Sequence, residues 1–190
     1  MPAEPTYVPG MSSPRPMTAE ELLHLNLPNK RTELVRGVLV VREPAGYTHG
    51  RVAANIMGKL SAHLDRTPTG QLFAAETGFR LTRGPDTVRA PELAYVRNER
   101  LLDPATRGFP DLAPDLVVEV LSPGDRPGEV LGKVADWLSA GTPLVWVIDA
   151  ERRSARVYRA DGSETLIGAQ DSLDGESVMP GFSCPLASIL

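Results

Sequence analysis

The sequence predicts an α/β domain in which helices flank a central mixed β-sheet. Two observations carry this prediction. Apolar runs with the length of buried strands alternate with amphipathic segments of helical period. A strand–helix–strand unit over residues 115–149 is expected to cross over right-handedly and leave its two strands parallel. The other strands follow one another through short turns, so we expect them to be antiparallel and the sheet to be mixed.

Length and composition favour one domain over residues 17–190. The chain has 190 residues and 42% hydrophobic content, enough for one well-formed core. Residues 1–16 contain five prolines and no hydrophobic period, which predicts a disordered lead-in.

The single cysteine, Cys184, excludes an internal disulfide and a thiolate-rich metal site. No apolar run is long enough to cross a membrane and no signal pattern is present, so we expect a cytoplasmic protein with no membrane partner.

The charge of the chain limits the class of partner. A formal charge of −4 is not that of a protein that coats nucleic acid through bulk electrostatics, although it leaves room for a local basic groove. Of the 20 basic residues only three are lysines, at positions 30, 59 and 133, so the chain uses arginine almost everywhere. A retained lysine therefore makes chemistry worth considering, above all at Lys133.

The N-terminal half predicts two helices and two hairpins. Thr18 and Glu21 form a capping-box pattern before a short helix that ends near Pro28. Apolar residues spaced by four, three and four predict a longer helix from Tyr47 to Leu64. The strands of the first hairpin are expected at 32–35 and 38–41, and those of the second at 71–82 and 87–96.

The C-terminal half predicts the strand–helix–strand unit and a set of edge strands. The unit combines an apolar strand at 116–121, a helix at 126–140 that ends at Gly141, and an apolar strand at 144–148. A polar loop at 97–113 precedes it, with a helical turn near residues 98–102. Short antiparallel edge strands are expected at 156–159, 164–167 and 176–179.

Glu119 is the anomaly in this pattern. It lies in the middle of the apolar run Leu116–Leu121, and ionised carboxylates are rarely buried without a partner, because desolvation costs several kcal/mol. Either a metal ion or Lys133, in the next helix, supplies the counter-charge. Lys133 has an alternative partner in Glu129, four residues earlier on the same helix.

Two further carboxylates, Glu33 and Glu92, lie in or beside apolar strands. Together with Glu119 they form the kind of oxygen donor set that Mg²⁺ prefers, since that ion is held by one or two carboxylates, waters and substrate phosphate. The alternative for Glu92 is a solvent-facing position at a strand end after proline. His49 is either a residue of an early helix turn or a base or phosphate contact.

The order of these features resembles the Uma-type family of restriction-endonuclease-like proteins, a branch of the PD-(D/E)xK nuclease superfamily. The resemblance covers residues 17–190. It depends on Glu33 before a glycine turn, His49 at the start of a helix, Pro91-Glu92 on a strand, and the sequence APDLVVEVLSP at residues 113–123 with Lys133 beyond it.

The resemblance implies a restriction-endonuclease-like core with a Mg²⁺-dependent phosphodiesterase site, in which Mn²⁺ can replace Mg²⁺. Glu92 and Glu119 match the metal-binding acids, Lys133 matches a lysine displaced into the following helix, Glu33 matches an accessory acid and His49 matches the family histidine. Glu92 departs from the family, which has aspartate there, and one extra methylene is expected to shift the metal and reduce turnover.

The implied function is hydrolysis of nucleic-acid phosphodiester bonds, with DNA as the substrate class and a homodimer as the assembly that suits cleavage of two strands. Two alternatives stay open. One is a catalytically degraded module that binds nucleic acid or a protein partner, and the other is a hydrolase for a small phosphorylated metabolite. No segment is a recognisable base-reading element, so the sequence predicts no site specificity.

Overall fold

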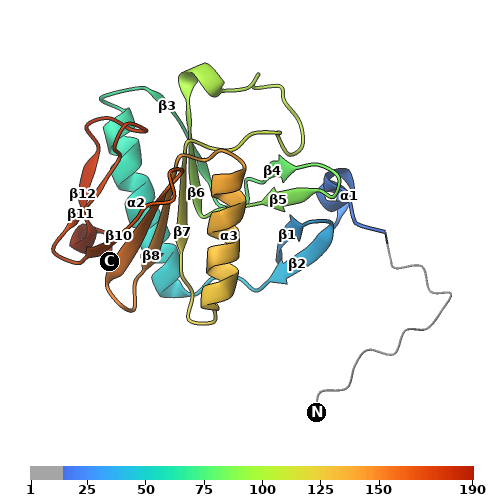
Figure 1. The fold of residues 1–190 in the computed structure, drawn as a ribbon, viewed down its shortest axis with the longest axis horizontal. Coiled ribbons are helices and arrows are strands. Elements are labelled where there is room, and N and C mark those ends of the chain that lie inside the picture. Colours follow the sequence, from blue (N-terminus) through green and yellow to red (C-terminus); the bar gives the residue numbers. More distant parts are fainter. Residues whose placement is uncertain (1–14) are drawn as a thin grey trace, which may run out of the picture.

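The computed structural model describes residues 15–190 and has mixed α and β structure (Figure 1). The predicted lead-in at 1–16 lies outside the described residues except for its last two positions. The largest sheet of the protein has six strands in the order β10-β9-β8-β7-β6-β3. These strands are β3 (Gly70–Ala74), β6 (Leu93–Arg97), β7 (Leu116–Val120), β8 (Leu144–Asp149), β9 (Ser154–Arg159) and β10 (Glu164–Gly168).

The predicted strand–helix–strand unit is present in this sheet. Strands β7 and β8 pair in parallel, with Leu116 opposite Leu144, and α3 (Pro127–Ser139) connects them. The other strand pairs of the sheet are antiparallel, which makes it mixed as expected. A parallel pair needs a long crossover connection, so placing β7 beside β8 also places α3 against the sheet.

Two helices cover opposite faces of the large sheet (Figure 1). Helix α2 (Tyr47–Leu64) has the predicted bounds, and its apolar stripe packs against Val118 and Val120 of β7. Val117, which points to the other face, packs against Val134 and Trp137 of α3. This alternation means that every second residue of β7, including Glu119, faces α3.

A second sheet, in the order β2-β1-β5-β4, lies beside the large one. The first predicted hairpin forms two of its strands, β1 (Arg31–Val35) and β2 (Val38–Arg42). Both turn residues, Arg36 and Gly37, have positive φ, as a two-residue turn that matches the strand twist requires. Helix α1 (Ala19–His24) carries the predicted capping box and packs on this sheet through Leu22.

The second predicted hairpin is divided between the two sheets. Its outer part, β3 with β6, belongs to the large sheet, while its inner part, β4 (Phe79–Thr82) with β5 (Thr87–Arg89), belongs to the small one. The prediction of continuous strands at 71–82 and 87–96 was therefore wrong in extent. The break in the second strand falls at Ala90–Glu92, where Pro91 cannot donate a ladder hydrogen bond.

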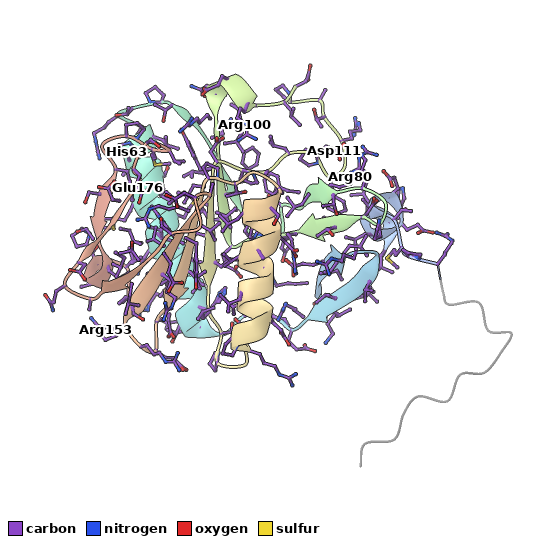
Figure 2. All side chains as sticks on the ribbon, viewed as in Figure 1. His63, Arg80, Arg100, Asp111, Arg153 and Glu176 are labelled. Carbon is purple, nitrogen blue, oxygen red and sulfur yellow. The ribbon has the colours of Figure 1, made fainter. Side chains whose placement is uncertain are left out.

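The loop before β7 is tied to β4 by an ion pair between Asp111 and Arg80, both labelled in Figure 2. Arg80 Nε donates to Asp111 Oδ1 at 2.6 Å, and the backbone N–H of Arg80 donates to the carbonyl of Pro110 at 2.8 Å. The predicted turn in this loop is a short 3₁₀ helix at Asn98–Arg100. These contacts hold a long connection in place at the start of β7.

One predicted edge strand is wrong. Residues 176–179 form a turn, because Glu176 has a φ of 50° and the N–H of Met179 donates to the carbonyl of Gly175. A small sheet of β11 (Ser172–Asp174) and β12 (Ser183–Pro185) flanks that turn, and a 3₁₀ turn at Leu186–Ser188 follows. No helix within residues 15–190 has both the length and the apolar character needed to span a membrane.

Candidate functional site

A cavity of about 620 Å³ lies between the β1–β2 hairpin, the C-terminal end of β7 and the first turns of α3. Figure 1 shows these three elements meeting below the middle of the molecule. The cavity is lined by every residue that the sequence predicted for the site, namely Glu33, His49, Glu92, Glu119 and Lys133. Residues far apart in the chain therefore converge on one space.

Glu119 is buried on the face of β7 that meets α3. Lys133 Nζ lies 3.2 Å from its Oε2, and Trp137 Nε1 donates to its Oε1 at 3.0 Å. Burial raises the pKa of the Glu119 carboxyl to about 7; the Lys133 ammonium opposes this rise, and the charges of Glu92 and Glu33 add to it. The apolar strand thus presents a carboxylate whose ionised form needs positive charge nearby.

Glu92 is buried beside Glu119. Leu93 of β6 pairs with Val118 in antiparallel register, so Glu92, the residue just before β6, adjoins Glu119. Its Oε1 accepts from Arg31 Nη2 at 2.7 Å and lies 3.0 Å from His49 Nε2. Burial favours the neutral carboxyl, but the hydrogen bond from His49 and the charge of Arg31 outweigh it and lower the pKa of Glu92 to about 2.

The second oxygen of Glu92 is accessible to solvent. Within residues 15–190, Oε2 has no hydrogen-bond or ion-pair partner, and it is not one of the buried polar atoms without a partner. The residue that carries this oxygen lines the cavity. The oxygen is therefore free to accept from water or to bind a cation. The alternative of a solvent-facing Glu92 is wrong, since only 6% of the residue is exposed.

Glu33 connects the site to the rest of the small sheet. Its Oε2 accepts from Arg89 Nη1 at 3.0 Å, and its Oε1 accepts from the backbone N–H of Ala90 at 3.2 Å and lies 3.8 Å from Lys133 Nζ. Lys133 thus lies between Glu33 and Glu119. The alternative partner Glu129 does not contact Lys133: its carboxylate reaches toward Arg42 at 3.4 Å.

Four residues around the site were not predicted from the sequence: Arg31, Arg89, Asp136 and Trp137. Arg89 donates to Asp136 through both Nε and Nη2, which ties β5 to α3 one turn beyond Lys133. Two of the four carry a signal in the sequence. Arg31 precedes Glu33 by two residues and so shares its strand face, and Trp137 follows Lys133 by four residues and so shares its helix face.

Trp137→Phe is expected to destabilise the fold by about 1–3 kcal/mol, because Glu119 Oε1 loses a buried donor while most of the aromatic packing is kept. Urea unfolding followed by far-ultraviolet circular dichroism measures the change. Phe73→Leu, an apolar change in the same core cluster that removes no hydrogen bond, is the control. A Trp137→Phe protein as stable as the wild type would contradict the assigned bond.

The donor set suits a hard divalent cation. Within residues 15–190 no group of three or more His, Cys, Asp or Glu side chains is placed to hold a metal ion together. Mg²⁺ needs less than such a cage, since one or two carboxylates with water and substrate phosphate suffice. Glu92 and Glu119 lie close enough for the charge of Glu92 to raise the pKa of Glu119, and a cation between them relieves that repulsion.

The fold matches that of a protein of known structure. A crystal structure described as a putative nuclease belonging to DUF820, from Anabaena variabilis ATCC 29413, matches with a TM-score of 0.77 at 18% identity. The match covers 92% of this chain and 97% of the other. A search of curated proteins found no significant match.

The family follows from the sequence itself. The model of the Uma2 family, described as "Putative restriction endonuclease", matches residues 19–187. The chain therefore belongs to this family of restriction-endonuclease-like proteins. The predicted family and fold class are both confirmed.

Proposed function

We propose that this protein is a Mg²⁺-dependent endonuclease that hydrolyses nucleic-acid phosphodiester bonds, with DNA as its substrate class. One observation carries the proposal: two buried carboxylates, Glu92 and Glu119, border one cavity with the ammonium of Lys133 beside them. Membership of the restriction-endonuclease-like family supports the same reaction class. Mn²⁺, which takes similar oxygen ligands, is expected to substitute for Mg²⁺.

Glu92 and Glu119 are the residues that would hold the cation. Glu92 offers an oxygen that is free of protein partners within residues 15–190, and Glu119 offers a buried carboxylate whose pKa, raised to about 7, a bound cation would lower. A divalent ion bound there supplies Lewis acidity toward the phosphate and lowers the pKa of a bound water.

The other residues act through fixed charge and orientation. The Lys133 ammonium stabilises negative charge that develops on the phosphate, as preorganised donors do in a site with little water. Glu33 keeps Lys133 between two carboxylates, and His49 orients Glu92 through its Oε1. In this arrangement Glu33 and His49 are positioning residues.

We also propose a homodimer, because two-fold dimers are the commonest assembly and two sites are needed to cut both strands of a duplex in one encounter. Sedimentation equilibrium of the full chain tests this directly. A protein that stays monomeric at micromolar concentration, alone and with a DNA duplex, would contradict it.

The proposed activity predicts Mg²⁺-dependent cleavage of at least one member of a DNA panel that contains duplex, single-stranded and nicked forms. Lys133→Ala should lower the rate by about 10²–10³-fold, the usual effect of removing one preorganised charge from such a site. Gel analysis of end-labelled DNA measures the rate. Lys59→Ala, an exposed lysine on α2 that does not line the cavity, is the matched control.

The possible outcomes separate the alternatives. If Glu92→Ala and Lys133→Ala both retained wild-type Mg²⁺-dependent cleavage, the site assignment would be wrong. DNA binding with no cleavage and no heat of metal binding would instead identify a degraded module. Cleavage of a small phosphorylated metabolite that DNA does not inhibit would identify a metabolite hydrolase.

A further inference from the structure

Two arginines face each other across the β1–β2 hairpin, in the wall of the cavity. Arg31 and Arg42 are register partners on the two strands, and both line the cavity. Directly opposed residues of an antiparallel pair lie on the same face with their Cβ atoms about 4.5–5.5 Å apart, and like charges in such positions destabilise the hairpin. Groups outside the hairpin must therefore offset the repulsion between the two arginines.

The donors of both guanidinium groups are incompletely used. An arginine has five N–H donors, and within residues 15–190 the only hydrogen bond from the Arg31 side chain is the one to Glu92. Arg42 reaches Asp125 and Glu129 only at 3.5 and 3.4 Å, the outer limit for hydrogen bonds. Its buried Nε has no hydrogen-bond partner in the described part of the chain.

Two of the three acids around Arg42, Asp125 and Glu33, also accept from other donors. Asp125 Oδ2 accepts from the backbone N–H of Ser122 at 2.8 Å. Glu33, whose Oε2 lies 3.9 Å from Arg42 Nε, accepts shorter bonds from Arg89 and from Ala90. Arg42 thus divides its charge among three carboxylates at 3.4 to 3.9 Å, and a cation held this loosely at a cavity wall is available to an incoming anion.

We propose that Arg31 and Arg42 bind a backbone phosphate of the nucleic acid in the cavity, one from each strand of the β1–β2 hairpin. This inference rests on the proposed function and names the residues that hold its substrate. The planar fork of a guanidinium matches two phosphate oxygens at once, and a phosphate between the two arginines removes their mutual repulsion. It also explains how a chain with a net charge of −4 binds a polyanion, since the positive charge is local.

Arg31 also connects phosphate binding with the proposed cation site. It donates to Oε1 of Glu92, and a cation on the other oxygen would draw negative charge from the same carboxylate and weaken that bond. Arg31 is then freer to turn toward the phosphate. By linkage, each ligand that favours this rearrangement strengthens the binding of the other.

The test is the salt dependence of DNA binding. Fluorescence anisotropy of a labelled 20-base-pair duplex is measured in EDTA, where metal-dependent cleavage cannot proceed, between about 50 and 200 mM salt. Arg31→Gln/Arg42→Gln should weaken binding at least about tenfold at low salt and reduce the slope of log K against log salt by about 1, the contribution of one neutralised phosphate. The control, Lys59→Gln/Arg66→Gln, removes the same charge from two exposed positions, one in the last turns of α2 and one just after it, and should leave both quantities unchanged.

Each result decides between the inference and the proposed function. If the wild type binds DNA and the double variant binds with the same affinity and slope, the arginine pair is not a phosphate site, although the nuclease proposal stands. If the control variant loses as much affinity for DNA, the effect comes from the overall charge of the protein, and the inference is overturned in the same way. If the wild type binds no DNA in EDTA, the arginine pair does not hold DNA by itself and the inference fails, while cleavage of the DNA panel in Mg²⁺ still decides the nuclease proposal. Should Arg31→Gln unfold the protein, Arg42→Gln decides alone, because its contacts to Asp125 and Glu129 are at their outer limit, and an unchanged affinity would overturn the inference.

Discussion

Glu119→Gln is expected to abolish the heat of divalent-cation binding and to reduce Mg²⁺-dependent hydrolysis at least about 10³-fold, the equivalent of several kcal/mol of transition-state stabilisation. The amide keeps the size of the side chain and an oxygen that accepts from Trp137 Nε1. It removes the negative charge that a cation needs. The change therefore tests the charge of Glu119 with little change to its packing.

Isothermal titration calorimetry with Mg²⁺ and Mn²⁺ measures the binding, and the DNA panel measures the rate. Glu151→Gln is the matched control, because Glu151 is exposed, follows the end of β8 and does not line the cavity. We expect the variant to fold, because Lys133 keeps Glu33 as a partner at 3.8 Å. Urea unfolding checks this expectation. Wild-type binding heat in Glu119→Gln would show that the cation, if there is one, binds elsewhere.

The main strands and helices could be predicted from the sequence because their signals are local. The capping box of Thr18 with Glu21 reappears, although its helix ends at His24 and not near Pro28, and residues 47–64 form a helix with the expected bounds. Glu119 was identified by the same logic, as one charge inside a strand whose neighbours are all apolar, and it is indeed buried. Local patterns therefore carried the prediction wherever the periodicity was strong.

The contacts that balance charge in the site could not be predicted in this way. The chain has 17 arginines, and no local pattern distinguishes Arg89, which is buried against Asp136 and Glu33, from Arg83, which is exposed. Their partners lie 28 to 56 residues away in the sequence. The break of the second hairpin between two sheets also depends on how the sheets pack, which the alternation of residues within a strand does not encode.

Arg89→Ala is expected to destabilise the protein by about 3–5 kcal/mol, a large part of the total stability of about 5–15 kcal/mol that is usual for a domain. Arg89 is 6% exposed and is the shared partner of Glu33 and Asp136. Without it, Asp136 loses its cation and Glu33 keeps only the more distant Lys133 and Arg42, at 3.8 and 3.9 Å. Removing one member of a buried ionic network costs far more than the network contributes, because desolvated charge is left behind.

Urea unfolding measures this loss, and Arg83→Ala is the matched control. Arg83 also pairs with an aspartate, Asp111, but its side chain is 63% exposed, so the same change there should cost at most about 1 kcal/mol. A similar small loss for Arg89→Ala would contradict the buried network.

Asp136→Asn separates stability from positioning. It leaves Arg89 paired with Glu33 but weakens the link between β5 and α3, one helical turn from Lys133. Because Lys133 acts only at a fixed distance from Glu119, a small shift of α3 should lower the cleavage rate more than it lowers stability, with kcat falling and KM little changed. A variant that loses stability but keeps kcat would show that the network supports the fold without positioning the lysine.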